Sequence, residues 1–298
     1  MDTDFIVVGG SFAGLSAALQ LARTNRPVTL IDAGLPRNRF ASAAHGVLGH
    51  DGRTPRAITD DGRTQLLAYP SASLRPGVAV AAQRIAGGFA VTLEDGARLS
   101  AKRLVLATGV VDQFPAIDGV RERWGVSVLH CPYCHGYENL GRRLAVIGMM
   151  PMSAHMAQLI GDWSPDMTYF ANGFAPDPEQ ALALAARGVK IEHSPVAAIE
   201  GPAPDMDAVL LADGRRVPID AAFIACQVKM ASPLAQQLGC AFDDGPLGQY
   251  VRTDQFQATT VDGVYAAGDM ASMLHGAAMA AAGGGLAGIG AHRSVVFA

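Results

Sequence analysis

The sequence is poor in charge and in cysteine. Only 17% of its 298 residues are charged, the formal net charge is −4, and four residues are cysteines. A nearly neutral chain offers no basic surface for nucleic acid or for an anionic membrane, so neither partner is expected. Because half of the residues are hydrophobic, the chain can fill a large core, and its length suggests about two domains of a globular enzyme.

Targeting signals are also lacking. Residues 1–4 are acidic, whereas a secretory signal begins with basic residues and continues into an apolar stretch. We therefore expect a cytoplasmic protein, in which four cysteines do not form a structural disulfide framework. The stretch from Met270 to His292 has no Lys, Arg, Asp or Glu and is long enough to span a bilayer. It is rich in alanine and glycine, however, and this favours a tightly packed helix over a membrane span.

The N-terminus has the pattern of a dinucleotide-binding turn. An apolar strand, Phe5–Val8, precedes a glycine-rich loop and the helical run Leu15–Ala22, and a second strand, Val28–Ile31, ends at Asp32. The loop residues are Gly9, Gly10, Ser11, Phe12, Ala13 and Gly14. Glycines allow the tight turn, the helix N-terminus meets a pyrophosphate, and the acidic residue holds a ribose. Serine stands where the usual motif has its middle glycine, and it is small enough for a phosphate to approach.

Two later segments indicate FAD rather than NAD at this loop. Thr108 and Gly109 follow a strand before the chain leaves the first domain, and Gly268 and Asp269 follow another strand after it returns. Flavoproteins with two dinucleotide domains place such a pair beside FAD, where the aspartate binds the ribitol chain. The sequence therefore predicts an α/β fold of two Rossmann-like domains.

The domain boundaries are expected at two turn-rich crossings. Residues 1–113 form the first part of the FAD domain, 114–247 a central NAD(P)-type domain, and 248–298 the second part of the FAD domain. Residues 33–64 are interpreted as a long loop that holds one helix. A second strand–helix unit starts at Leu144–Ile147 in the central domain.

The motif His-Cys131-Pro-Tyr-Cys134-His135 allows four interpretations. Two cysteines at positions i and i+3 suit a redox disulfide. The same string occurs at c-type haem attachment, which requires export. A zinc site is the third interpretation, but its ligands would be one Cys-x-x-Cys and the two histidines directly beside it, and adjacent residues cannot easily form a tetrahedral set of ligands. Two buried structural thiols are the fourth possibility. The position after an FAD-type half favours the redox disulfide and no metal, with Cys226 and Cys240 as packing residues.

In their order along the chain, these parts resemble the low-molecular-weight thioredoxin reductase family over nearly the whole sequence. The segment Cys131–Glu138, CPYCHGYE, is more similar to one branch, the FAD-dependent dithiol oxidases that close the disulfides of gliotoxin, holomycin and romidepsin. This resemblance implies a homodimer that uses FAD, a small-molecule dithiol and O2. It implies further that Cys134 faces the flavin, Cys131 exchanges with substrate, and His135 transfers protons.

Additional site residues follow from the same resemblance and from side-chain chemistry. His275 is a second candidate for moving protons, because histidine is the side chain that ordinarily titrates near neutral pH. The remaining implied cofactor contacts are Ala33, Arg37, His45, Gly276, Ala277 and Ala278.

The second dinucleotide loop departs from the reductase pattern. After Leu144–Ile147 the chain reads Gly-Met149-Met150-Pro151-Met-Ser. The methionines fill the space of a pyrophosphate, and Pro151 lacks a backbone N–H, so the sequence predicts a nicotinamide domain that has lost its nucleotide site. The alternative is a reductase fed by NADPH, through a divergent but working loop, or by a protein electron donor. Such a reductase would have a thioredoxin-like partner. A non-catalytic flavoprotein is a third possibility. The sequence does not identify the dithiol.

Overall fold

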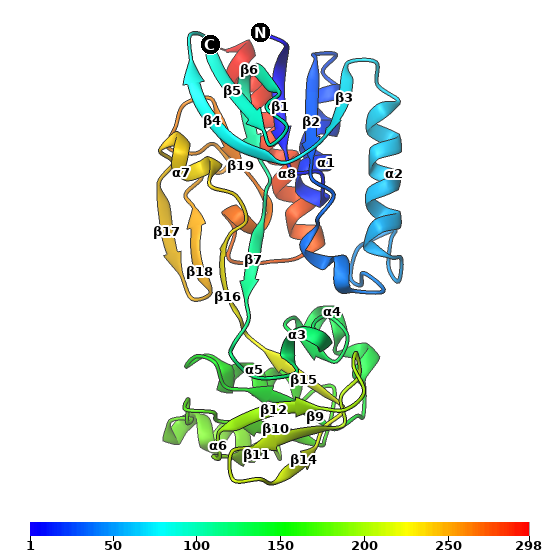
Figure 1. Ribbon diagram of the computed structural model, residues 1–298, viewed down its shortest axis with the longest axis vertical. Helices are drawn as coiled ribbons and strands as arrows, with labels where there is room; N and C mark the ends of the chain where they lie inside the picture. Colours follow the sequence, from blue (N-terminus) through cyan, green and yellow to red (C-terminus); the bar gives the residue numbers. More distant parts are fainter. Residues whose placement is uncertain (298) are drawn as a thin grey trace. The chain divides into compact units, whose positions relative to one another are not determined.

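The computed structural model describes residues 1–297, and these residues divide into two compact units (Figure 1). Unit 1 comprises residues 1–39, 47–111 and the chain from residue 228 onward, whereas unit 2 comprises residues 40–46 and 112–227. Each unit is a Rossmann-like α/β fold, which confirms the predicted fold class.

Unit 1 is built on a seven-stranded sheet. The strand order is β3-β2-β1-β6-β5-β4, and β19 also pairs with β6. β1, β2, β3, β6 and β19 are parallel, while the β4–β5 hairpin continues the sheet in antiparallel fashion. The strands are β1 (Thr3–Val8), β2 (Val28–Asp32), β3 (Ala72–Pro76), β4 (Ala79–Ile85), β5 (Gly88–Leu93), β6 (Arg98–Leu106) and β19 (Val264–Ala266). The central strands are continuous apolar runs because both faces of a parallel sheet are covered.

Two helices of unit 1 lie in the regions where the sequence indicates helices. α1 (Phe12–Ala22) starts directly after the glycine-rich loop. α2 (Pro55–Leu67) is the helix expected within the long loop; it starts after Thr54, whose hydroxyl accepts the N–H of Ala57 at 3.1 Å. Proline at its first position loses no intrahelical hydrogen bond.

The glycine-rich C-terminal segment forms α8 (Ala277–Val296), which packs against α1 (Figure 1). A Cβ atom on Gly284 would come 2.0 Å from the carbonyl oxygen of Ala13, and one on Gly288 would come 2.7 Å from that of Ala17. The glycines therefore let two backbones approach, as predicted for a tightly packed helix. Among the described residues, no helix is both long and apolar enough to span a membrane.

Unit 2 has a five-stranded parallel sheet with the order β11-β10-β9-β15-β8 and a small antiparallel sheet, β12-β13-β14. The strands are β8 (Val128–Leu129), β9 (Leu144–Ile147), β10 (Met167–Phe170), β11 (Lys190–Glu192), β12 (Val196–Glu200), β13 (Ala208–Leu211), β14 (Arg216–Pro218) and β15 (Ala221–Ile224). The helices are α3 (Val120–Arg123), α4 (Pro132–His135), η2 (Tyr137–Asn139), α5 (Ser153–Ile160) and α6 (Pro178–Ala186).

The return crossing lies earlier in the chain than the sequence indicates. The two connections, β7 (Val110–Gln113) and β16 (Gln227–Met230), pair with each other. Residues from Val228 onward join the core of unit 1, where Leu234 and Cys240 are buried beside β4 and β5. The segment expected to cross at residue 248 is instead the turn of a hairpin, β17 (Phe242–Gly245) and β18 (Gly248–Val251). Turn-forming residues signal a reversal of the chain, but they do not tell a hairpin from a domain crossing.

Candidate active site

The glycine-rich loop of unit 1 has room only for glycine at three positions. Gly9 has φ +109°, and a Cβ there would come 2.2 Å from the carbonyl oxygen of Ala107. A Cβ on Gly14 would come 1.6 Å from the carbonyl oxygen of Gly9, and one on Gly10 would come 2.3 Å from Cγ of Asp32. The loop therefore lies close to the residues at the ends of β2 and β6. It positions the N-terminus of α1 at the carboxyl ends of these strands. This cradle fits the pyrophosphate of a dinucleotide.

Asp32, at the end of β2, ties the loop together. Its Oδ1 accepts the N–H of Gly10 at 3.3 Å and that of Gly34 at 2.9 Å. Its Oδ2 accepts a hydrogen bond from Arg63 at 2.8 Å. Arg63 lies on α2, far from the motif in sequence, so no local pattern identified it. The carboxylate is placed where a ribose hydroxyl could donate to it, and Ala33 follows it at the surface.

The predicted residues at the other strand ends of unit 1 also lie together. Thr108 donates its hydroxyl hydrogen to the sulfur of Met270 at 3.4 Å. Gly109 and Gly268 both have positive φ, and a Cβ on Gly268 would come 2.9 Å from Cβ of Ala13. The segments after β6 and β19 therefore line the same end of the sheet as the glycine-rich loop, as parallel pairing of these strands requires.

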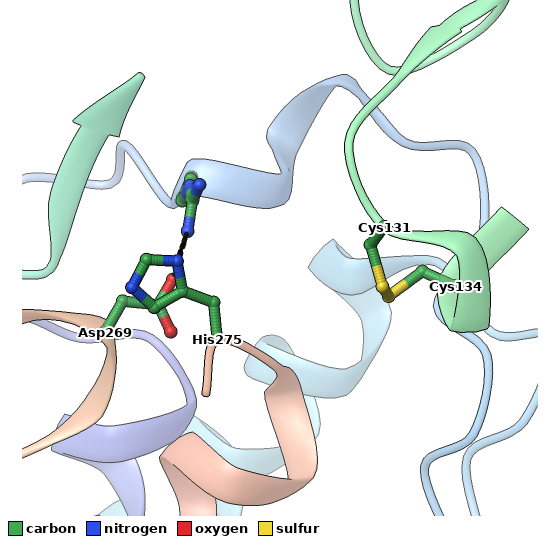
Figure 2. The surroundings of a disulfide bond; sticks show 5 residues. Cys131, Cys134, Asp269 and His275 are labelled. Atoms are coloured by element: carbon green, nitrogen blue, oxygen red, sulfur yellow. Dashed lines mark hydrogen bonds and ion pairs between the residues drawn. A yellow bond between two sulfur atoms is a disulfide. The ribbon is translucent and has the colours of Figure 1, made fainter. Parts of the chain in front are cut away.

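Arg37 brings two further predicted residues together. Its Nη1 donates to Oδ2 of Asp269 at 2.8 Å and to Nδ1 of His275 at 2.9 Å. Asp269 lies in η3 (Gly268–Ala271), and His275 lies two residues before the start of α8 (Figure 2). Gly276 is the N-cap residue of α8 and offers no side-chain cap. The first N–H groups of that helix, those of Ala277 and Ala278 among them, have no intrahelical acceptor.

In unit 2, Cys131 and Cys134 form a disulfide, with their Cα atoms 5.3 Å apart (Figure 2). Cys131 is the N-cap residue of α4 and Pro132 its first residue, which brings Cys134 one turn further along the same helix. Both cysteines are half-buried. The predicted redox pair is thus closed as a disulfide in the structure.

His135 directly follows Cys134 in α4 and interacts electrostatically with two other titratable groups. Burial is the main cause that lowers the pKa of His135 below its usual 6.5; Glu138 raises this pKa and His45 lowers it. The imidazole is therefore neutral at pH 7 and can accept a proton. Below about pH 6.5 the unfolded chain binds this proton more tightly than the folded one, so His135 makes the fold less stable as the pH falls.

His45 and Glu138 also lie together. Nε2 of His45 is 3.4 Å from Oε1 of Glu138. His45 is a predicted cofactor contact, and it lies in unit 2, on the segment 40–46. Glu138 is not among the predicted site residues, although it stands inside the motif that carries the resemblance.

The shape of the disulfide helix depends on Gly136 and Trp163. A Cβ on Gly136 would come 2.7 Å from the indole ring of Trp163 and 2.6 Å from the carbonyl oxygen of Pro132. Tyr133 meets the same indole edge-on, with ring centroids 5.9 Å apart. The glycine after His135 is thus required by packing, while Tyr133 stays 73% exposed beside the disulfide.

The second dinucleotide loop of unit 2 is closed by its own side chains. Oγ of Ser153 accepts the N–H of Met149 at 3.1 Å and that of Met150 at 3.3 Å. Met150 is buried, and Ser153 begins α5. The backbone donors that a phosphate would use at this position are therefore already bound by a hydroxyl. No pattern in the sequence indicates this role of Ser153.

The other two cysteines lie in apolar cores, Cys226 in unit 2 and Cys240 in unit 1. Burial raises the pKa of the Cys240 thiol, which disfavours the reactive thiolate. Among residues 1–297 no group of three or more His, Cys, Asp or Glu side chains is arranged to hold a metal ion.

A dinucleotide cradle and a Cys-x-x-Cys disulfide in one chain define a disulfide oxidoreductase with two Rossmann-like domains. The family model described as pyridine nucleotide-disulphide oxidoreductase matches residues 3–285, and the chain belongs to this family. It is an oxidoreductase and a flavoprotein of the thioredoxin reductase-like kind, which confirms the resemblance seen in the sequence.

Individual relatives agree with this assignment. A protein named thioredoxin reductase tcpT, from Claviceps purpurea (strain 20.1), is 32% identical over 286 residues, covering 91% of this chain and 87% of that protein. A crystal structure of an oxidoreductase from Agrobacterium tumefaciens has 44% identity and a TM-score of 0.95, covering 100% of this chain and 99% of that one. The crystal structure of HlmI has 34% identity and a TM-score of 0.92, with 99% and 93% covered.

Proposed function

We propose that this protein is an FAD-dependent dithiol oxidase that converts a small-molecule dithiol to a disulfide, with O2 as electron acceptor and H2O2 as by-product. The observation that carries the proposal is the contrast between the two dinucleotide loops. The loop of unit 1 is a cradle of backbone groups, whereas in the loop of unit 2 Ser153 occupies the N–H groups of Met149 and Met150. A reductase needs nicotinamide bound at the second loop, but an oxidase does not.

FAD is the flavin that fits unit 1. Gly9, Gly10 and Gly14 leave space for the pyrophosphate, and Asp32 can accept a ribose hydroxyl. Asp269, in η3 shortly after β19, is the carboxylate proposed to bind the ribitol chain. Bound FAD would supply a two-electron acceptor that oxygen can reoxidise.

The cysteine pair can exchange with a dithiol without any other oxidant. A substrate thiolate attacks Cys131 and displaces the Cys134 thiolate, which gives a mixed disulfide. The second substrate thiolate attacks the substrate sulfur of this bond and releases Cys131, and the oxidised product leaves. The two electrons and two protons removed from the dithiol now reside on the cysteine pair, and two electrons and two protons reduce O2 to H2O2.

His135 is the group proposed to take up protons in this exchange. It directly follows Cys134, and its depressed pKa keeps the imidazole neutral at pH 7. Glu138, which shifts the His135 pKa in the opposite direction, can stabilise the imidazolium once the proton has been transferred.

The second candidate function is disulfide reduction with electrons from NADPH or from a protein donor. The intact fold of the nicotinamide domain favours it. Anaerobic stopped-flow spectroscopy of the purified yellow protein separates the two. Bleaching of the flavin by a small dithiol such as dithiothreitol, and not by NADPH, followed by H2O2 formation on admission of oxygen, supports the oxidase. Bleaching by NADPH alone supports the reductase.

We also propose a homodimer. The C-terminal helix α8 carries exposed apolar side chains, Met279, Leu286 and Ile289 among them, and such a row suits a self-association surface. Light scattering of the flavin-loaded protein would show twice the chain mass, whereas a monomer at micromolar concentration would contradict the proposal.

A further inference from the structure

We propose that Arg37 is a positioning residue that fixes His275 as the neutral tautomer with its proton on Nε2. His275 then acts as a hydrogen-bond donor to an oxygen or nitrogen acceptor of the bound flavin nucleotide, and not as a base for the dithiol. The direction of donation rests on the proposed FAD site, whereas the tautomer rests on the protein alone.

The three residues come from three separate parts of unit 1. Arg37 begins η1 (Arg37–Phe40), shortly after β2; Asp269 follows β19; and His275 precedes α8. The side chains of Arg37 and Asp269 are only 16% and 19% exposed. A partly buried contact between distant segments holds its members in one arrangement more firmly than a fully exposed ion pair does.

The chemistry of Arg37 decides the protonation state of its histidine partner. A guanidinium has N–H donors and no acceptor, so a hydrogen bond from Nη1 at 2.9 Å requires an unprotonated Nδ1 on His275. The proton of the neutral ring then lies on Nε2. A hydrogen on Nδ1 would face another donor, and the hydrogen bond would be lost.

Asp269 completes the arrangement. The same Nη1 donates to its Oδ2 at 2.8 Å, and one amino group has the two hydrogens that these two bonds need. The carboxylate balances the charge of Arg37, so His275 presents a donor without adding net positive charge. Such a donor orients a polar acceptor in a dinucleotide site. With Nδ1 engaged and Nε2 protonated, the ring has no lone pair left to take a proton from a thiol.

Nitrogen-15 NMR of protein labelled at histidine tests the tautomer directly. Protonated and unprotonated ring nitrogens differ widely in chemical shift, and the signals of His275 are identified by their loss in His275→Gln. We expect protonated Nε2 and unprotonated Nδ1 at pH 7.5, in both flavin-free and flavin-loaded protein. Arg37→Gln should give a mixture of tautomers, whereas Arg39→Gln, which removes another arginine of η1, should not. A protonated Nδ1 in the unaltered protein would overturn the proposal.

Flavin affinity tests the donor role. Gln carries its amide donor near the position of Nε2, so His275→Gln should bind FAD within about twofold of the unaltered protein. His275→Ala should raise the dissociation constant about five- to tenfold, the scale of one hydrogen bond. Unchanged affinity in the alanine variant would disprove the donor role. If no form of the protein binds FAD, the proposed function fails, while the NMR result still decides the tautomer.

Discussion

The hydroxyl oxygen of Ser153 accepts a hydrogen bond from the backbone N–H of Met149, 3.1 Å away, at the turn where a nicotinamide nucleotide would place its pyrophosphate. Phosphate recognition at a strand–helix turn depends on such N–H groups. In this loop they stabilise the turn itself. In the proposed function, the loss of nucleotide binding therefore follows from the hydrogen bonds of Ser153 as well as from the bulk of the methionines.

Nicotinamide nucleotides should therefore fail to reduce the flavin. Neither NADH nor NADPH at sub-millimolar concentration should bleach it within seconds in anaerobic stopped-flow experiments. Ser153→Ala should not restore the reaction, because buried Met150 and the missing N–H of Pro151 remain. Full bleaching of the unaltered protein by NADPH within one second would reject this account.

Replacing His135 with Ala should slow flavin reduction by a dithiol by roughly 10²–10⁴-fold, the usual contribution of a general base. Reoxidation by oxygen of enzyme reduced beforehand should change far less. In the unaltered protein the base form persists above a pKa that lies below 6.5, so the reductive rate should fall only on the acid side of that value.

The matched control for this experiment is His155→Ala, an exposed histidine on α5. It should leave both half-reactions unchanged. An His135→Ala variant with the normal reductive rate from mildly acidic to alkaline pH would remove His135 from the mechanism.

The two neighbouring glycines Gly284 and Gly285 should respond to alanine in opposite ways. A Cβ on Gly284 meets the backbone of α1 at 2.0 Å, whereas one on Gly285 meets only the Ser16 hydroxyl at 3.6 Å. Gly284→Ala should destabilise the fold by about 1–3 kcal/mol or more through overpacking. Gly285→Ala should be neutral or stabilise it by roughly 0.5–1 kcal/mol through helix propensity. Thermal unfolding measures both, and equal melting temperatures would contradict the α1–α8 packing.

Thiol counting under denaturing conditions should follow the redox state of one cysteine pair. The sequence has four cysteines, and one disulfide joins Cys131 to Cys134. The oxidised protein should therefore have two titratable thiols per chain, and the protein reduced anaerobically by dithiol should have four. Cys131→Ser and Cys134→Ser should each keep the yellow flavin and lose dithiol turnover, while Cys226→Ser should retain it. Turnover in either of the first two variants would exclude the disulfide exchange.

Local sequence patterns were sufficient to predict the parts of the site whose residues are close together in the sequence. The glycine-rich loop, Asp32 at the end of its strand and the disulfide of Cys131 and Cys134 all rest on spacings that the chain displays directly. The partners of these groups were not predictable in the same way. Arg63 reaches Asp32 from α2, and no periodicity marks this arginine among the others of that helix.

The same limit explains the misplaced domain boundary. Residues 228–247 contain turn signals and short apolar runs that are compatible with either unit. Only the packing of Leu234 and Cys240 beside β4 and β5 assigns them to unit 1. His45 likewise stands within the FAD half by sequence order, yet its neighbour is Glu138 of unit 2. For residues 228–247 and for His45, contacts between segments far apart in the chain determine the unit to which they belong.

The position of β19 beside β6 has a consequence for synthesis of the chain. Val264 pairs with Leu104, so the sheet of unit 1 gains this strand only after the whole of unit 2 has been made. At roughly 5–20 residues per second, synthesis of the chain between the glycine-rich loop and α8 (Ala277–Val296) takes roughly 13–53 seconds, so α1 stays uncovered by α8 for that time. Unit 2, which except for segment 40–46 is continuous in sequence, can fold in that interval. The strand ends of unit 1 that are proposed to hold the flavin are therefore brought together only after unit 2 has been synthesised.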